Sequence, residues 1–194
     1  ATIIIQGGDH TTGHDPLTGK ELWRFADNPK KQTHWRLIPT PVIAGDIIFC
    51  TQPRGAMAYG FRPTPDKEMD LTTADWLYEE QTADVSSSVY YKKRLYVINE
   101  VRKTLTSIDP ASGKVIWTGD LQSPARYWSS PVAADNKIYC INEDGGVSVV
   151  KATDTFKLIA YSPLEKSITK STPAIADNKI FIRTGKRLYC IAQK

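Results

Sequence analysis

The three histidines of this 194-residue chain all fall within its first 34 positions, at His10, His14 and His34. Three imidazoles can form a zinc site, but such sites show recognised spacings, such as two histidines four residues apart on a helix. These histidines follow no such pattern. We therefore predict no metal site and interpret them as hydrogen-bonding groups.

Arginine and aromatic residues recur in segments between apolar runs. Their side chains suit carboxylate, phosphate or sugar ligands, and the same residue types are enriched at binding hot spots. We expect one ligand- or protein-binding face, made of His10, His34, Trp35, Arg36, Arg54, Arg126, Trp128 and Arg183. Four arginines would make that face electropositive and favour an anionic partner.

In an alternative interpretation, each arginine pairs with a nearby acid and only ties the loops together. Candidate acids are Asp9, Asp84, Glu100 and Glu143. Catalytic residues are not predicted, because no Ser-His-Asp order, nucleophile elbow or glycine-rich phosphate loop stands out.

The elements that carry these residues repeat along the chain. The segment SSPVAADNKIYCINEDGG at 129–146 recurs at 171 and 39 and, more loosely, at 86; its landmarks are Pro41, Ser88, Pro131 and Pro173, spaced by 47, 43 and 42 residues. A second landmark is HDPLTGKELW at 14–23 and IDPASGKVIW at 108–117, with a degenerate DWLYEE at 75–80. The corresponding segment at 149–160, VVKATDTFKLIA, lacks the Asp and the Trp.

Each repeat contains four short runs rich in Ile, Val and Tyr. In one copy they span 131–134, 137–142, 147–151 and 157–161, separated by turn residues. Four strands in roughly 40–50 residues are typical of a β-propeller blade. We predict an all-β partial propeller of about four and a half antiparallel blades, from a ring of seven or eight. The expected blades are 1–27 (partial), 38–81, 86–121, 129–161 and 171–194 (partial).

Further expectations concern packing. Trp23, Trp76 and Trp117 should be buried between blades on fourth strands. The segment 62–75, RPTPDKEMDLTTAD, replaces the usual turn and is expected to be a solvated excursion, with a partner contact as the alternative. Cys50, Cys140 and Cys190 occupy strand positions and should pack as small apolar residues.

The Ser/Thr-Pro first strand, the KIYCIN-type second strand and the DPxTGKxxW ending resemble the pyrroloquinoline-quinone (PQQ)-type repeat family. That family includes eight-bladed quinoprotein alcohol dehydrogenases and a non-enzymatic propeller lipoprotein of outer-membrane assembly. The resemblance implies a periplasmic or extracellular location. It covers almost the whole chain, but fold alone does not imply function.

In the dehydrogenases of this family, adjacent cysteines form a disulfide ring beneath the quinone, and Glu, Asn and Asp hold a calcium ion. The cysteines of this chain are isolated. We therefore expect a non-catalytic ligand- or protein-binding scaffold without a cofactor. The alternative is part of a quinoprotein-like oxidoreductase that binds PQQ through residues upstream of Ala1.

The amino-acid composition excludes some classes of protein but does not indicate a function. Apolar residues make up 41% and charged residues 24%, which are globular values, and 25 basic against 21 acidic residues give a net charge of +4. The lysines lie mostly in turns, which indicates solvated surface rather than a nucleic-acid interface. The sequence contains neither an apolar run long enough to span a membrane nor a signal peptide.

The two ends both correspond to partial blades: Thr2–Gly8 corresponds to a second strand, and Arg187–Ala192 to a third. We therefore expect Ala1 not to be the native N-terminus, so the missing signal peptide decides nothing. Open blades expose sheet faces, which favours self-association.

Overall fold

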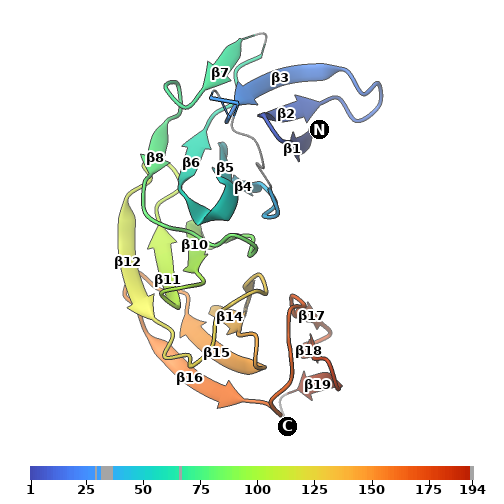
Figure 1. Ribbon diagram of the computed structural model, residues 1–194, viewed down its shortest axis with the longest axis vertical. Coiled ribbons are helices and arrows are strands. Elements are labelled where there is room, and N and C mark those ends of the chain that lie inside the picture. Colours follow the sequence, from blue (N-terminus) through green and yellow to red (C-terminus); the bar gives the residue numbers. More distant parts are fainter. Residues whose placement is uncertain (29, 32–36, 66, 193–194) are drawn as a thin grey trace.

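The chain forms an open arc of five β-sheets arranged side by side (Figure 1). This computed structural model describes residues 1–28, 30–31, 37–65 and 67–192. The N-terminus lies at one end of the arc and the C-terminus at the other. The predicted all-β fold, an open and incomplete propeller of four-stranded blades, is confirmed.

The sheets follow the chain in order. Blade 1 contains β1 (Ile3–Gln6), β2 (His10–His14) and β3 (Glu21–Ala26), and blade 2 contains β4 (Val42–Ala44), β5 (Ile47–Thr51), β6 (Ala58–Phe61) and β8 (Trp76–Tyr78). Blade 3 contains β9 (Val89–Tyr91), β10 (Arg94–Asn99), β11 (Thr104–Ile108) and β12 (Val115–Asp120). Blade 4 contains β13 (Val132–Ala134), β14 (Lys137–Ile141), β15 (Gly146–Lys151) and β16 (Leu158–Pro163), and blade 5 contains β17 (Ala174–Ala176), β18 (Lys179–Arg183) and β19 (Leu188–Ala192). One short 3-10 turn, η1 (Pro53–Gly55), lies between β5 and β6.

The DPxTG landmark is a turn held by its aspartate. Asp109 Oδ1 accepts hydrogen bonds from the backbone N–H groups of Ala111 and Ser112, at 3.1 and 3.0 Å. Gly113 follows with a φ of 70°, a conformation that glycine adopts without a Cβ penalty. Asp15 and Gly19 repeat the same arrangement in blade 1, so the turn chemistry follows directly from the sequence.

The core lies between the blades, in clusters that each combine two neighbouring sheets. Trp23, Trp76 and Trp117 are only 7, 7 and 8% exposed, as predicted. A Cβ at Gly60 would lie 2.3 Å from the indole of Trp76, so only glycine admits the ring at that distance. Burial of large aromatic surface between sheets is the main force that joins the blades.

The segment 62–75 differs from the expected solvated excursion. Within it, β7 (Glu68–Asp70) pairs in parallel with β3 and extends the sheet of blade 1. Met69 is buried against Trp23 and Phe25, which explains why an otherwise polar insertion contains an apolar residue at this point. The insertion of blade 2 therefore covers the outer edge of blade 1.

The cysteines follow the expectation at two positions of three. Cys50 and Cys140 are buried in strands of blades 2 and 4, and burial raises the pKa of the Cys50 thiol to about 12. Cys190 is exposed, which is a correction. It pairs with Phe181 on the face of blade 5 that turns away from blade 4, so no neighbouring sheet covers it.

A ladder of hydroxyl groups joins the inner strands of four blades. The backbone N–H of Thr40 donates to Ser87 Oγ at 2.8 Å, and that of Ser87 to Ser130 Oγ at 2.9 Å. The N–H of Ser130 donates to Thr172 Oγ1 at 3.3 Å. This ladder explains the Ser/Thr that precedes each repeat landmark, because the hydroxyl accepts a bond from the preceding blade.

Candidate functional site

One face of the arc combines the turns between second and third strands with the connections between blades. The backbone N–H of Arg54, in such a turn, donates to Asp84 Oδ1 in the following connection, at 3.0 Å. The N–H of Glu143 donates to the carbonyl of Arg126 at 2.8 Å, and Gly185 N–H to the carbonyl of Ile168 at 2.8 Å. We call this surface, formed by the turns 52–57, 100–103, 142–145 and 184–187 and the connections 79–88, 121–131 and 164–173, the mouth face.

An amide side chain at the end of the second strand ties this face across blade boundaries. Gln52 Nε2 donates to the carbonyl of Asp27 at 3.1 Å. In the next two blades, Asn99 Nδ2 donates to the carbonyl of Gln81 at 2.9 Å, and Asn142 Nδ2 to Ser123 Oγ at 2.8 Å. The sequence analysis missed this role, although the repeated Asn or Gln at one position was a visible signal.

Two of the predicted arginines, Arg54 and Arg126, lie on the mouth face, whereas Arg183 ends β18 opposite Leu188 on the face of blade 5 that turns away from blade 4. Arg54, Arg126 and Arg183 are exposed. In the part of the chain that the structure describes, none of their guanidinium groups forms a salt bridge; Arg54 meets Asp84 only through its backbone N–H. The alternative in which every arginine pairs with an acid therefore has no support at these three positions.

Trp128 also lies on the mouth face, where Lys170 covers its ring with Nζ 4.8 Å from the centroid. Its Nε1 is buried and has no hydrogen-bond partner among the described residues. Ile168 lies with Lys170 in the connection 164–173 and is 72% exposed, although its backbone carbonyl accepts a hydrogen bond from the N–H of Gly185.

Ion pairs surround Ile168 between blades 4 and 5. Lys166 pairs with Asp144 at 3.3 Å, and Glu165 pairs with both Lys186 and Arg187, at 3.3 and 2.7 Å. A pocket of about 440 Å³ lies here, lined by Asp144, Lys166, Ser167, Ile168, Gly185 and Lys186. These ion pairs join the connection 164–173 to the turns of blades 4 and 5.

The remaining predicted site residues do not join this set in the structure. His10 begins β2 and lines a separate pocket with Arg24, Glu68 and Thr73, where β7 meets β3. Placing His10 on the mouth face was therefore wrong, because its side chain belongs to the strand and not to the preceding turn. His34, Trp35 and Arg36 lie outside the described residues.

A buried polar cluster lies beneath the start of the first connection. Asp27 is 1% exposed, and its Oδ2 accepts hydrogen bonds from Tyr59 Oη at 3.0 Å and Thr11 Oγ1 at 3.2 Å. Desolvation raises the pKa of the Asp27 carboxyl, and the hydrogen bonds from Tyr59, Gln6 and Thr11 oppose this shift. The cluster joins blades 1 and 2 and is closed to solvent, so we assign it a structural role.

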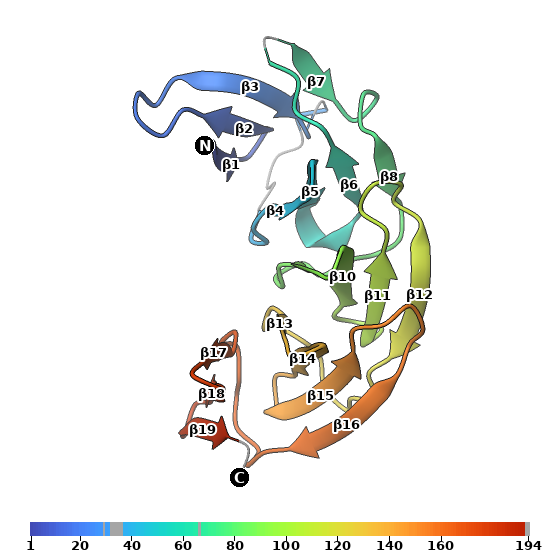
Figure 2. The ribbon, with the colours of Figure 1, turned by 180° about the vertical axis from the view of Figure 1, so that it is seen from behind.

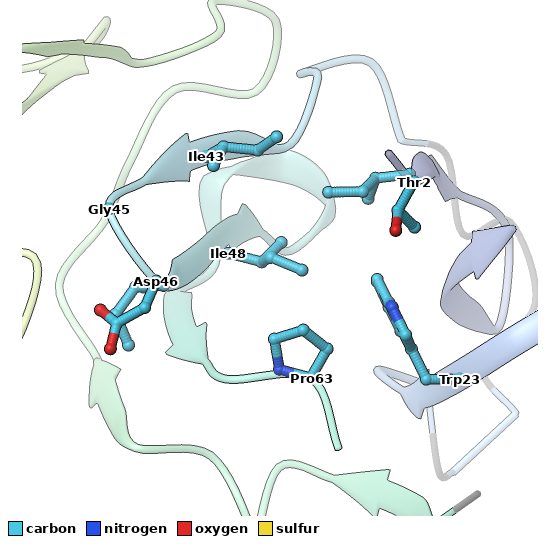
Figure 3. Close-up of a pocket in the computed structure, with 9 residues that line it drawn as sticks. Thr2, Trp23, Ile43, Gly45, Asp46, Ile48 and Pro63 are labelled. Carbon is cyan, nitrogen blue, oxygen red and sulfur yellow. The ribbon is translucent and has the colours of Figure 1, made fainter. Parts of the chain in front are cut away.

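A small apolar pocket lies between blades 1 and 2, on the side opposite the mouth face. Its volume is about 180 Å³, and Trp23, Ile43, Ile48 and Pro63 surround it, with the carboxylate of Asp46 at one side (Figure 3). No hydrogen bond joins Trp23 Nε1 to an acceptor in the described ranges, unlike the indoles of Trp76 and Trp117.

Comparison with known proteins decides the family. The sequence profile of the family described as outer membrane protein assembly factor BamB matches residues 67–191, from the insertion of blade 2 to the last strand. The chain belongs to this PQQ-like repeat family. No curated protein shows significant sequence similarity to the chain.

Solved structures of this repeat architecture are similar over most of the chain. BamB from Moraxella catarrhalis is 14% identical with a TM-score of 0.66, over 93% of this chain and 50% of that one. Quinohemoprotein alcohol dehydrogenase ADHIIG from Pseudomonas putida is 16% identical with a TM-score of 0.60, over 78% of this chain and 28% of that one. The computationally designed Ika8 protein is 10% identical with a TM-score of 0.64, over 97% and 57%. The chain thus spans half or less of the two natural proteins, and at these identities the similarity shows the fold alone.

The quinone of the PQQ-type dehydrogenases does not fit the described residues of this chain. Cys50 and Cys140 lie in different blades, and burial holds both thiols in the protonated form by raising their pKa values. The described part of the chain contains no group of three or more His, Cys, Asp or Glu side chains that could hold a metal ion. We therefore derive no reaction through a quinone or a metal.

None of the residues that the structure describes forms a helix with the length and apolar character needed to cross a bilayer.

Proposed function

We propose that this chain is a non-catalytic binding module that docks a protein partner on its mouth face. The observation that carries the proposal is the pair of exposed guanidinium groups on this face, at Arg54 and Arg126, without acidic partners among the described residues. Hydrogen bonds between turns and connections hold the backbone that presents them. Such preorganisation lowers the entropy cost of binding.

The chemistry of the face favours an acidic polypeptide with an apolar side chain. Guanidinium groups recognise carboxylates in bidentate geometry, while Ile168 and the ring of Trp128 offer apolar contact. A small anion would use the arginines but not these apolar groups. We therefore favour a protein over a small anionic ligand.

The family suggests where such a module works. Its description names outer membrane assembly, and one solved relative is a BamB protein. We propose that this chain acts outside the cytoplasm, in the periplasm or beyond, as a scaffold for other proteins. An oxidoreductase role finds no supporting group among the described residues.

A peptide titration tests the proposed chemistry. The probe is a labelled ten-residue peptide of alternating Glu and Leu, and its control has Lys in place of Glu. Fluorescence anisotropy should show binding of the acidic peptide only, with an affinity that falls as salt rises, because screening weakens exposed charge pairs. Equal binding of the two peptides, or binding of the basic peptide alone, would refute an electropositive docking face.

A further inference from the structure

The tryptophan of the repeat occupies one register position in three successive blades, and the fourth blade departs from it. Trp23 pairs with Gly13, Trp76 with Gly60, and Trp117 with Ser107. In blade 4 the corresponding pair is Ala160 with Val149. Ala160 therefore stands where the other complete blades carry an indole.

In the complete interfaces, this indole connects two blades. Trp76 Nε1 donates to the carbonyl of Pro110 in blade 3 at 2.9 Å, and Trp117 Nε1 to the carbonyl of Thr153 in blade 4 at 2.8 Å. Trp76 also packs in one cluster with Ile108 on the third strand of blade 3. Each indole thus fills the space between its own sheet and the third strand of the next blade.

Blade 5 presents the same third-strand surface to blade 4, but no indole reaches it. Ile191 pairs with Ile180 in blade 5 in the same way that Ile108 pairs with Leu95 in blade 3. Val149 and Ala160 supply only small side chains on the facing sheet. The exchange of a glycine–tryptophan pair for a valine–alanine pair removes far more side-chain volume than it adds.

A cavity of about 1030 Å³ lies between blades 4 and 5, on the side opposite the mouth face. Blade 4 contributes Ala134, Asp135, Lys137 and Tyr139, and blade 5 contributes Ile175, Asp177, Asn178, Lys179, Ile180, Ile191 and Ala192. By comparison, Trp23 lines two smaller pockets at the boundary of blades 1 and 2, of about 180 and 400 Å³. Figure 2 shows β13 and β17 as neighbours at the inner edge of these two blades.

The lining combines apolar walls with a charged rim. Ile175, Ile180, Ile191 and Tyr139 provide the apolar surface. Lys137 pairs with Asp135 at one rim, while Asp177 and Lys179 lie at the other. Ligand sites typically have a volume of about 300–1,000 Å³, apolar walls and a few polar groups that orient the ligand.

We propose that this cavity is a binding site for a small planar aromatic molecule of about the size of an indole ring. Such a ring would take the place that the repeat gives to tryptophan elsewhere, against the apolar walls. This site is separate from the mouth face and does not depend on the proposed function.

The test uses indole as the probe and the full chain as the protein. Saturation-transfer NMR and a thermal shift should both show indole binding to the wild-type chain at millimolar concentrations, with a raised melting temperature. Ala160→Trp should weaken indole binding at least tenfold, because its own ring would take the place that the repeat gives to tryptophan in the other blades. Thr155→Trp, which adds an indole at an exposed turn position of the same blade, should leave indole binding unchanged.

A second variant guards against misfolding of the first. Val149→Gly with Ala160→Trp restores the glycine–tryptophan pair of blades 1 and 2 and should also abolish indole binding. Binding of the acidic peptide to the mouth face should persist in both variants, which separates this proposal from the proposed function. The proposal is overturned if the wild-type chain does not bind indole at several millimolar, or if the folded tryptophan variants bind it as tightly as the wild type.

Discussion

The indole nitrogen of Trp76 lies 2.9 Å from the carbonyl oxygen of Pro110, in the landmark turn of the next blade. The Asp-Pro turn of blade 3 therefore presents a carbonyl to the indole of the preceding blade. The corresponding bond from Trp117 ends at Thr153, where the turn has lost its Asp-Pro sequence but keeps the carbonyl in place.

Replacing this indole tests the contribution of the hydrogen bond. Trp76→Phe keeps an aromatic ring but leaves the buried Pro110 carbonyl without its donor, at a cost of about 1–3 kcal/mol. Trp23→Phe is the matched control, because no hydrogen bond from Trp23 Nε1 exists within the described residues. Chemical denaturation should show a larger loss of unfolding free energy for Trp76→Phe. Equal losses would mean that ring volume, and not the bond, stabilises the interface.

A glycine in the mouth face offers a test of how closely the turns approach the connections. Gly55 has a φ of 64°, and a Cβ there would lie 2.2 Å from the carbonyl oxygen of Thr82. Gly55→Ala should therefore destabilise the chain by more than the roughly 1–2 kcal/mol that a left-handed alanine costs. Gly19→Ala, at a φ of 72° with open space around it, should show only the latter cost in thermal unfolding. A similar loss for both variants would contradict the close approach.

Much of the fold could be predicted from the sequence because each repeat carries the same landmark, strand and turn residues. The spacing of Pro41, Ser88, Pro131 and Pro173 defines the blades, and strand alternation with turn residues defines the strands. The role of the insertion was missed, because parallel pairing of Glu68–Asp70 with β3 depends on a sheet edge in another blade. Local sequence carries no signal for such a long-range pairing.

The buried carboxyl of Asp27 makes stability depend on pH. Desolvation raises its pKa in the folded chain above the ordinary value of 3.8, so the unfolded chain ionises first as the pH rises. Between these two pKa values the folded state holds a proton that the unfolded state releases, and folding stability therefore falls with rising pH. The Asp27→Asn variant has no carboxyl at this position, so its unfolding releases no proton here.

The melting temperature of Asp27→Asn minus that of the wild type should therefore increase between pH 4 and pH 7. Differential scanning fluorimetry at matched ionic strength measures this difference. A constant difference, or one that shrinks towards pH 7, would show that the carboxyl is not destabilised by burial.

The outward face of blade 5 should promote self-association. Leu188 is 71% exposed there, beside Cys190 and Phe181 on a sheet with no neighbour in this chain. Leu188→Glu should shift sedimentation velocity profiles towards monomer, because a charge opposes apolar sheet stacking. Leu17→Glu, at a 93% exposed turn position away from either end face, should leave the profile unchanged. A wild-type chain that is monomeric at all concentrations would contradict this prediction.

The candidate site was only partly predictable from the sequence. Arg54, Arg126 and Trp128 share the mouth face because turns and connections of successive blades open on the same side, whereas Arg183 ends a strand and faces outward from blade 5. His10 was misplaced because a shift of one or two residues at a strand start moves a side chain from the turn to the sheet. The exposed Ile168 carried no sequence signal, since only the fold shows that its backbone is fixed and its side chain uncovered.

Two charge-matched double variants test the docking face most directly. Arg54→Ala with Arg126→Ala removes two positive charges from the mouth face; Lys20→Ala with Lys114→Ala removes two exposed charges from the opposite side. Anisotropy titration with the acidic peptide should show at least tenfold weaker binding for the arginine double variant only, with melting temperatures within a few degrees of the wild type. Equal weakening by both double variants would indicate a general charge effect. Intact binding with a lowered melting temperature in the arginine double variant would show that these arginines stabilise the blades and do not bind a partner.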